Sequence, residues 1–434
     1  MTTTPRLAAP ADTAGPDDTA GPADTAAAAA PAPDGSRTTE RDLVLDVVRT
    51  GALGVVVLWH WVFHTVRWTD GGPRVGNPVA VTPGMWALTW FLQVMPAFFV
   101  IGGTLHSRGT VASTSTSTGT GTGTRTGTSS AASTALAFWS ARLRRLLVPV
   151  LPLLGIAGAA AATALAVGRP DVARIVVLVI SPLWFLVVYV VCVVATPAAR
   201  WAHRRIGLAA VAVLAAAAVL VDVLRIGRGV GGNATGAAAF VCVWLAVHQL
   251  GFHFGRLRAA STRTQLAVTL GGFAAMALLV TVGPYPAAMV GVDGAKLSNL
   301  GPPTVMVVCL AVAQMGLLSL LAPAIARLGE RHRPLLEVTS RWSMTVYAWH
   351  LLAYAIFWGL FAALLSIVNR PVDSRVDLVW WLQRPLWLMG PAILAIPLCR
   401  AVARFDQAGR VNPAAQFDHA ARVDTSAPVQ SSAR

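Results

Sequence analysis

The sequence is poor in charged residues and nearly devoid of lysine. Charged residues make up 12% of the 434-residue chain, about half of the roughly 25% that soluble domains carry. Lys296 is the only lysine, so arginine supplies almost all of the positive charge. Because apolar residues make up 55% of the chain and gather in long runs, the shortage of charge excludes an ordinary water-soluble globular protein.

Metal-binding spacings and a nucleic-acid signature are also missing. Four cysteines (Cys192, Cys242, Cys309 and Cys399) stand singly inside apolar runs, without a C-x-x-C pair or a Cys/His metal spacing. The formal charge of +15 raises the question of a nucleic-acid partner. However, the arginines lie in short clusters between apolar runs, as the positive-inside rule predicts for membrane proteins. We therefore expect no bound metal and no nucleic acid, and a lipid bilayer as the surroundings.

Three polar segments divide the chain. Residues 1–39 are rich in Ala, Thr, Pro and Asp, and they lack the basic and apolar regions of a signal peptide. Residues 110–134 form a Ser/Thr/Gly tract, and residues 405–434 are polar. These compositions predict two disordered tails and one flexible loop, with a membrane-embedded domain over 40–404.

The apolar runs predict an all-α fold, a polytopic transmembrane bundle of about ten spans, since about 20 apolar residues cross a bilayer. The predicted spans are 43–65, 84–105, 146–167, 174–197, 207–225, 236–254, 265–283, 304–325, 343–366 and 379–401. The arginine clusters are richer in the loops that lie on the same side of the membrane as the two termini. The positive-inside rule assigns that side to the cytoplasm. We therefore predict a plasma-membrane protein with both termini in the cytoplasm.

The first span carries a polar stripe. Asp46, Arg49, His60 and His64 fall within about 60° of one another on a helix. Ionisable residues inside a membrane cost about 2.5–3.5 kcal/mol each on insertion scales, so each is a functional candidate. The alternatives are a core histidine bonded to a neighbouring helix or a zinc pair at the i, i+4 spacing. No Glu follows the first His and no third ligand is evident, which disfavours zinc.

Two further patterns point to chemistry. Ser343, Tyr347, His350 and Tyr354 share one face of the ninth span, although tyrosines alone are also typical of the membrane interface. Before the third span, Arg142 and Arg145 share a face from which Arg144 is turned away. This pair has two interpretations. The arginines either follow the positive-inside rule at the cytoplasmic surface, or they bind phosphate, because guanidinium groups bind phosphate oxygens bidentately.

Taken in order, these patterns resemble acyltransferase family 3, a family of integral-membrane proteins with about ten spans. The motifs that carry the resemblance are Asp46-xx-Arg49 with His60 eleven residues on, Arg142-xx-Arg145 with Pro149, Ser343-xxx-Tyr347-xx-His350 and the Phe-rich stretch 95–103. The resemblance covers residues 40–402. The chain departs from the family in its long Thr/Gly loop and in having no fused extracytoplasmic domain, which leaves the acceptor in doubt.

The resemblance implies transfer of an acyl group, usually acetyl, from cytosolic acyl-CoA to a hydroxyl of a carbohydrate or related acceptor. Acyl-CoA is then a substrate, and no permanently bound cofactor is expected. The implied catalytic residues are His60, as general base, with His350, Asp46 and Arg49. Arg142 and Arg145 are expected to bind the donor, and Ser343 and Tyr347 to contact substrate. Direct transfer and a covalent acyl-histidine remain open.

Other assignments stay open at this stage. The loop over 282–304, with Asp293, Lys296, Ser298 and Asn299, is either a Pro/Gly-rich connector or a surface that contacts a polar acceptor. His248 and His253 are five residues apart, do not share a helix face and receive no role. The same stripes would also suit a transporter of a sugar or small acid, although no matching pair of Gly/Pro-interrupted spans is present.

Overall fold

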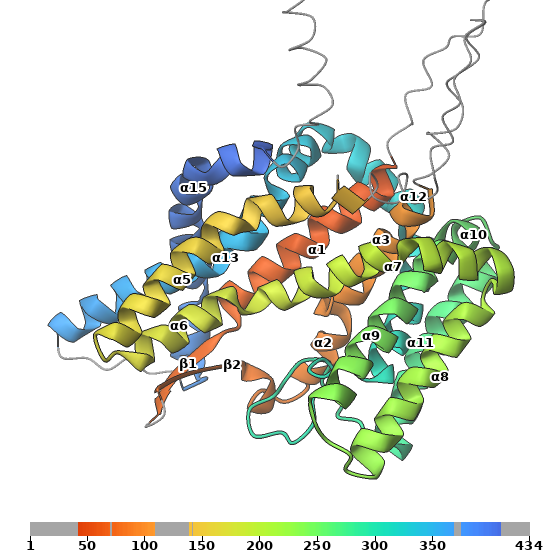
Figure 1. The fold of residues 1–434 in the computed structure, drawn as a ribbon, viewed down its shortest axis with the longest axis horizontal. Coiled ribbons are helices and arrows are strands. Elements are labelled where there is room, and N and C mark those ends of the chain that lie inside the picture. Colours follow the sequence, from red (N-terminus) through yellow and green to blue (C-terminus); the bar gives the residue numbers. More distant parts are fainter. Residues whose placement is uncertain (1–41, 70–71, 109–138, 141, 369–374, 409–434) are drawn as a thin grey trace, which may run out of the picture. The chain divides into compact units, whose positions relative to one another are not determined.

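The computed structural model describes residues 42–69, 72–108, 139–140, 142–368 and 375–408 (Figure 1). The expected tail over 1–39 and the expected loop over 110–134 lie outside the described residues. So does the second tail, apart from residues 405–408 at the end of the last helix.

The described chain is almost entirely helical and holds ten helical spans long and apolar enough to cross a membrane, which confirms the predicted all-α fold. The helices are α1 (Leu43–Val62), α2 (Met85–Leu92), α3 (Met95–Arg108), α5 (Leu151–Ala166), α6 (Pro170–Ile180), α7 (Trp184–Ile206), α8 (Ala209–Asp222), α9 (Asn233–Leu250), α10 (Phe254–Arg258), α11 (Thr262–Val282), α12 (Val305–Arg331), α13 (Arg333–Ile367), α14 (Leu378–Leu382) and α15 (Arg384–Ala408). Short 3-10 or π turns are η1 (Pro78–Ala80), η3 (Val148–Val150), η4 (Ser181–Leu183), η5 (Val223–Gly227) and η6 (Gly251–His253).

Several span boundaries differ from the prediction. Helix α13 begins at Arg333 rather than at 343, with Pro334 in its first turn, where the missing N–H of proline has no helical partner to lose. Helix α7 continues to Ile206 with Pro197 inside it, although the prediction ended at 197. Hydropathy marks the part of a helix that lies in lipid, and it does not register polar extensions beyond the bilayer.

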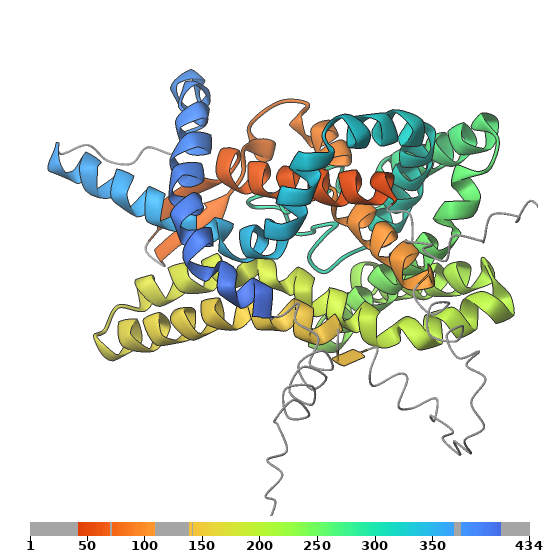
Figure 2. The same ribbon diagram turned by 90° about the horizontal axis from the view of Figure 1, so that it is seen from above.

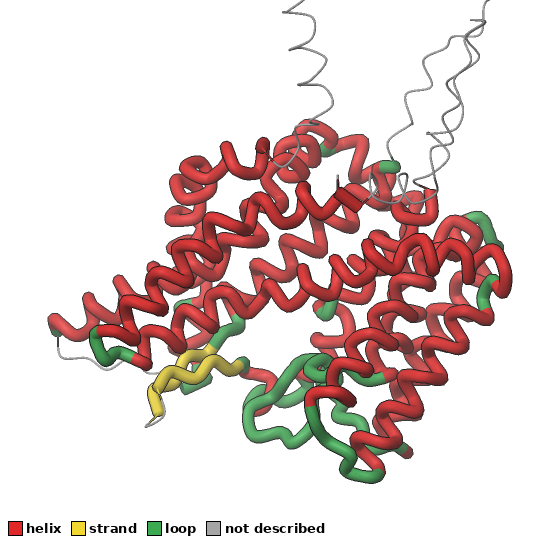
Figure 3. Tube along the Cα trace, in the orientation of Figure 1, coloured by secondary structure: helices red, strands yellow, loops and turns green. Residues whose placement is uncertain are grey.

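The structure also contains a β-hairpin that the sequence analysis did not predict. Strands β1 (Thr65–Thr69) and β2 (Gly72–Gly76) pair antiparallel, with Val66 opposite Val75. Figure 3 shows this hairpin in yellow directly after α1. The first span therefore ends at Val62 rather than at 65, and the N–H of Phe63 caps it on the carbonyl of Trp59.

The second span is broken between α2 and α3. Pro96 lacks the N–H that a continuous helix would bond to the carbonyl of Leu92, and the helix is interrupted at 93–94, directly before α3 begins at Met95. Gln314 of α12 repairs the break: its Nε2 donates to the carbonyl of Gln93 at 2.8 Å and its Oε1 accepts from the N–H of Ala97 at 3.0 Å. Such repair is required because lipid offers no hydrogen-bond partners.

Helix α1 packs against α3, α12, α13 and α15 (Figure 1, Figure 2). At its start, the carboxylate of Asp42 accepts from Arg108 at 3.0 Å and from Arg258 at 2.8 Å. Burial alone would raise the pKa of Asp42, but the two guanidiniums outweigh it and hold that pKa below its ordinary value of 3.8. This stabilisation is therefore present at neutral pH and is lost only as the pH falls through the lowered pKa.

Helix α3 and η6 approach so closely that only glycine fits. A Cβ on Gly251 would collide with the backbone of Val100 and Thr104.

We expect Gly251→Ala to lower the free energy of unfolding by about 1–3 kcal/mol, the usual effect of overpacking. Thermal unfolding in detergent measures this. Gly255→Ala is the matched control, since a Cβ there meets no atom within 4 Å, and an equal loss in both variants would contradict the close-approach explanation.

Candidate active site

The core of the candidate site is a pair of imidazoles on neighbouring helices. Nδ1 of His60 on α1 lies 2.7 Å from Nε2 of His350 on α13. The ring centroids are 5.0 Å apart and the ring planes are inclined by only 14°, so the two rings are nearly coplanar and meet edge to edge. His350 is 1% exposed. The structure therefore brings together the two histidines that the sequence placed on separate polar stripes.

The backbone around His350 determines where the protons of this pair lie. Nδ1 of His350 is 2.7 Å from the carbonyl oxygen of Tyr347, and because a carbonyl only accepts, this nitrogen carries the hydrogen. Nε2 of neutral His350 is then an acceptor, so Nδ1 of His60 donates to it. The remaining lone pair of His60 is on Nε2, the nitrogen that a general base requires.

Arg49 connects the polar stripe of α1 to α13. Arg49 lies 3.9 Å from Asp46, an ion-pair distance rather than a hydrogen bond, and donates to the hydroxyl of Ser340 at 2.8 Å. Ser343 donates to the carbonyl of Ser340 at 3.0 Å. Asp46 and Arg49 thus pair within α1, and Ser340 of α13 is a further partner of Arg49.

Arginines gather around a cavity of about 420 Å³, called here the arginine cavity. Arg49, Arg142 and Arg145 line it, together with Ser343 and Tyr347. Arg144 does not line this cavity, as the helical spacing predicts. Five of the predicted site residues therefore border one space between α1, α13 and the start of the third span.

His60 borders a second space of about 250 Å³, called here the histidine cavity. It adjoins the arginine cavity, since Val56, Met95 and Tyr347 line both. The hydroxyl of Tyr347 donates to the carbonyl of Pro182 at 2.6 Å, which fixes this ring between the two spaces. A ligand held by the arginines would therefore reach toward His60 past Tyr347.

His64 lies beyond the end of α1, so the helical spacing that placed it on the stripe does not apply. Its ring still contacts His60, at a centroid distance of 4.9 Å, and Tyr354, at 5.7 Å. Among the described residues, no group of three or more His, Cys, Asp or Glu side chains is arranged to hold a metal ion.

The structure contains a second pair of imidazoles, which no sequence pattern predicts. Nδ1 of His106 on α3 lies 2.9 Å from Nε2 of His248 on α9, and His106 lines the arginine cavity. Arg200, 9% exposed, donates to the carbonyl of His106. The rule that intramembrane ionisable residues are functional candidates would have identified both histidines, but neither belongs to a recognisable spacing.

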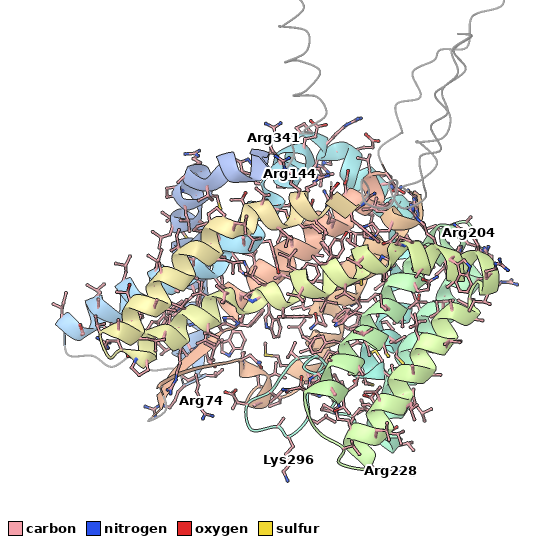
Figure 4. All side chains as sticks on the ribbon, in the orientation of Figure 1. Arg74, Arg144, Arg204, Arg228, Lys296 and Arg341 are labelled. Carbon is pink, nitrogen blue, oxygen red and sulfur yellow. The ribbon has the colours of Figure 1, made fainter. Side chains whose placement is uncertain are left out.

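The basic residues also define two ends of the bundle. Figure 4 shows Arg144, Arg204 and Arg341 at one end and Arg74, Arg228 and Lys296 at the opposite end. The first three belong to loops predicted to face inside and the last three to loops predicted to face outside. We call these ends the Arg144 end and the Lys296 end.

The fold and the buried polar residues define a multi-pass helical membrane protein with a polar interior site. Comparison with family models identifies its class: an acyltransferase domain model, that of acyltransferase family 3, matches residues 42–403. The chain belongs to this family and is a membrane O-acyltransferase. No curated protein sequence and no solved structure matches the chain. The match confirms the resemblance and favours the acyltransferase hypothesis over the transporter hypothesis.

Proposed function

We propose that the protein transfers an acyl group, with acetyl as the expected group, from cytosolic acyl-CoA to a hydroxyl of a carbohydrate or similar acceptor. The observation that carries this proposal is the adjoining pair of cavities, one lined by three arginines and the next by His60. The first suits a polyphosphate, and the second supplies a base for the reacting hydroxyl.

On the donor side, Arg142, Arg145 and Arg49 face a cavity that no Asp or Glu of the described part of the chain lines. Guanidinium groups bind phosphate oxygens bidentately, so these arginines hold the phosphates of coenzyme A. Ser343 and Tyr347 border the same cavity and contact the pantetheine arm as it passes toward His60. Acyl-CoA is a substrate here, and the mechanism needs no permanently bound cofactor.

At the reacting centre, Nε2 of His60 accepts the proton of the acceptor hydroxyl as its oxygen attacks the thioester carbonyl. The new C–O bond forms, the C–S bond breaks and the coenzyme A thiolate takes the proton back from His60. His350 is a positioning residue, because its hydrogen bond fixes the tautomer of His60. Asp46 and Arg49 partly neutralise each other at the donor end.

The orientation of the protein follows from its donor. If coenzyme A enters from the cytoplasm of a plasma-membrane protein, the Arg144 end faces inward. We expect single cysteines at Arg228→Cys, but not at Arg144→Cys, to react with an impermeant maleimide in intact cells. Both side chains are exposed, and a background lacking the four native cysteines serves both. Labelling of Arg144→Cys without permeabilisation would reverse the orientation and contradict a cytosolic donor.

The proposed function is tested by comparing a strain that lacks this protein with its parent. Mass spectrometry of surface glycans and secreted metabolites should show one set of acyl groups missing in the deletion strain. Re-expression of the wild-type chain should restore the set, while His60→Ala should not. Unchanged acylation in the deletion strain would contradict the proposed function.

A further inference from the structure

The break between α2 and α3 places a glutamine in the middle of an apolar run. Gln93 is the capping residue at the C-terminal end of α2, and only 7% of its surface is exposed. A buried N–H or C=O group that lacks a partner costs about 1–3 kcal/mol. Each polar group of Gln93 therefore requires a partner, and its bonds show which group is left over.

Three of the four polar groups of Gln93 are bonded within the protein. The backbone N–H donates to the carbonyl of Thr89 at 3.1 Å. The backbone carbonyl accepts from Nε2 of Gln314 at 2.8 Å, and the side-chain Oε1 accepts from the N–H of Met95 at 3.4 Å. Among the described residues, Nε2 of Gln93 has no acceptor. The amide hydrogens of this side chain are thus not used by the protein itself.

The unused donor belongs to a side chain that lines the histidine cavity, as His60 does. The other hydroxyl and amide side chains of the described chain that line this cavity donate to backbone carbonyls; they are Asn77, Thr89, Ser181 and Tyr347. Gln93 therefore differs from them in having a donor that is free for a bound molecule.

Acyl transfer in this cavity needs such a donor. When a hydroxyl attacks a thioester, the carbonyl oxygen becomes an oxyanion, and fixed N–H groups stabilise it in enzymes that transfer acyl groups. The imidazole pair does not supply this hydrogen. Nε2 of His60 holds the lone pair of the base, and its Nδ1–H donates to His350.

The position of Gln93 suits this task. The histidine cavity, at about 250 Å³, is smaller than the roughly 300–1,000 Å³ of most ligand sites, so a carbonyl brought to His60 also lies close to the other walls. Met95 lines both cavities, so a thioester passing between them enters beside Gln93. Gln314 bonds the backbone on both sides of the break, and this fixes the donor before the reaction.

We propose that Nε2 of Gln93 is the oxyanion donor of the acyl transfer. The hydroxyl oxygen of the acceptor bonds to the thioester carbon, its proton passes to Nε2 of His60, and the carbonyl electrons move onto the oxygen that Gln93 bonds. The intermediate collapses as the C–S bond breaks and the thiolate takes the proton from His60. This role rests on the proposed function and gives the break in the second span a chemical purpose.

The oxyanion role is measured without turnover, by the binding of two unreactive analogues of acetyl-CoA. Acetonyl-CoA has a methylene between sulfur and carbonyl and remains a ketone, whereas its trifluoro analogue is hydrated in water to a tetrahedral diol. Isothermal titration with the purified protein gives both dissociation constants. We expect Gln93→Met to weaken binding of the trifluoro analogue about ten- to a hundredfold and that of acetonyl-CoA less than about threefold.

Gln265→Met is the matched control. It makes the same change at another buried glutamine, which lines neither cavity and whose Nε2 donates to the carbonyls at the end of α10. It should lower thermal stability without changing the ratio of the two dissociation constants. If Gln93→Met weakens both analogues equally, or neither, the proposal is overturned, and the indole N–H groups of Trp59 and Trp184, which line the same cavity, become the next candidates.

A second variant tests the same role in the reaction. Gln93→Glu keeps an oxygen for the N–H of Met95 and puts a carboxylate where the oxyanion forms. Transfer from radiolabelled acetyl-CoA is measured in permeabilised cells of the deletion strain, which contain the native acceptor. We expect a loss of at least about 10²–10³-fold, and a rate within about threefold of wild type would contradict the proposal. If the wild-type protein binds neither analogue, the donor site and the proposed function fail together.

Discussion

His60→Ala should lower acyl transfer by about 10²–10⁴-fold, the usual contribution of a positioned general base, while membrane insertion and donor binding persist. The physical reason is that the lone pair on Nε2 of His60 is the one that the bond between the two imidazoles does not use, and alanine removes it. Turnover per folded molecule, measured together with acyl-CoA affinity and thermal stability, checks this result.

His350→Ala is the companion variant and should have a smaller effect on acyl transfer. It removes the acceptor that keeps the hydrogen of His60 on Nδ1, but the base itself remains. A positioning role also predicts a changed pH dependence of turnover, which a purely structural loss would not produce. Turnover of His60→Ala within about threefold of wild type would contradict the assignment, and His350 would then be the first candidate for the base.

The second large effect concerns the donor. Arg142→Lys with Arg145→Lys keeps both charges but loses the bidentate geometry, so acyl-CoA affinity should fall about ten- to a hundredfold. Isothermal titration or equilibrium dialysis with the purified protein measures the dissociation constant.

Arg144→Lys is the matched control for this double variant. It makes the same chemical change one position away, on a side chain that does not line the arginine cavity. It should leave the affinity unchanged. Wild-type affinity in the double variant would show that Arg142 and Arg145 serve only as a positive anchor at the membrane surface.

Much of the fold and part of the site could be predicted from the sequence. Hydropathy and helical periodicity are local properties, so the ten spans and the stripes through His60 and His350 were predictable. Their pairing was not, because the 2.7 Å contact joins residues 290 positions apart, and the packing of α1 on α13 is not encoded in any one span.

The failures have equally physical causes. The predicted stripe extends to His64 although the helix ends at Val62, since the apolar run continues through Phe63, beyond the last helical residue. The break at Gln93 depends on a distant amide, that of Gln314, which repairs it. The loop over 282–304 was open to a connector interpretation because its order comes from the buried side chain of Asn299.

The hydrogen bond between His350 and the carbonyl of Tyr347 also bears on how the reaction is driven. A carbonyl oxygen has no proton to pass on, so the chain of imidazoles ends there. In the proposed reaction, a proton accepted by His60 returns to the leaving thiolate and does not cross the bilayer. On this mechanism, the free energy for acylation comes from the thioester alone, and collapse of the transmembrane proton gradient by an uncoupler leaves the rate of transfer unchanged.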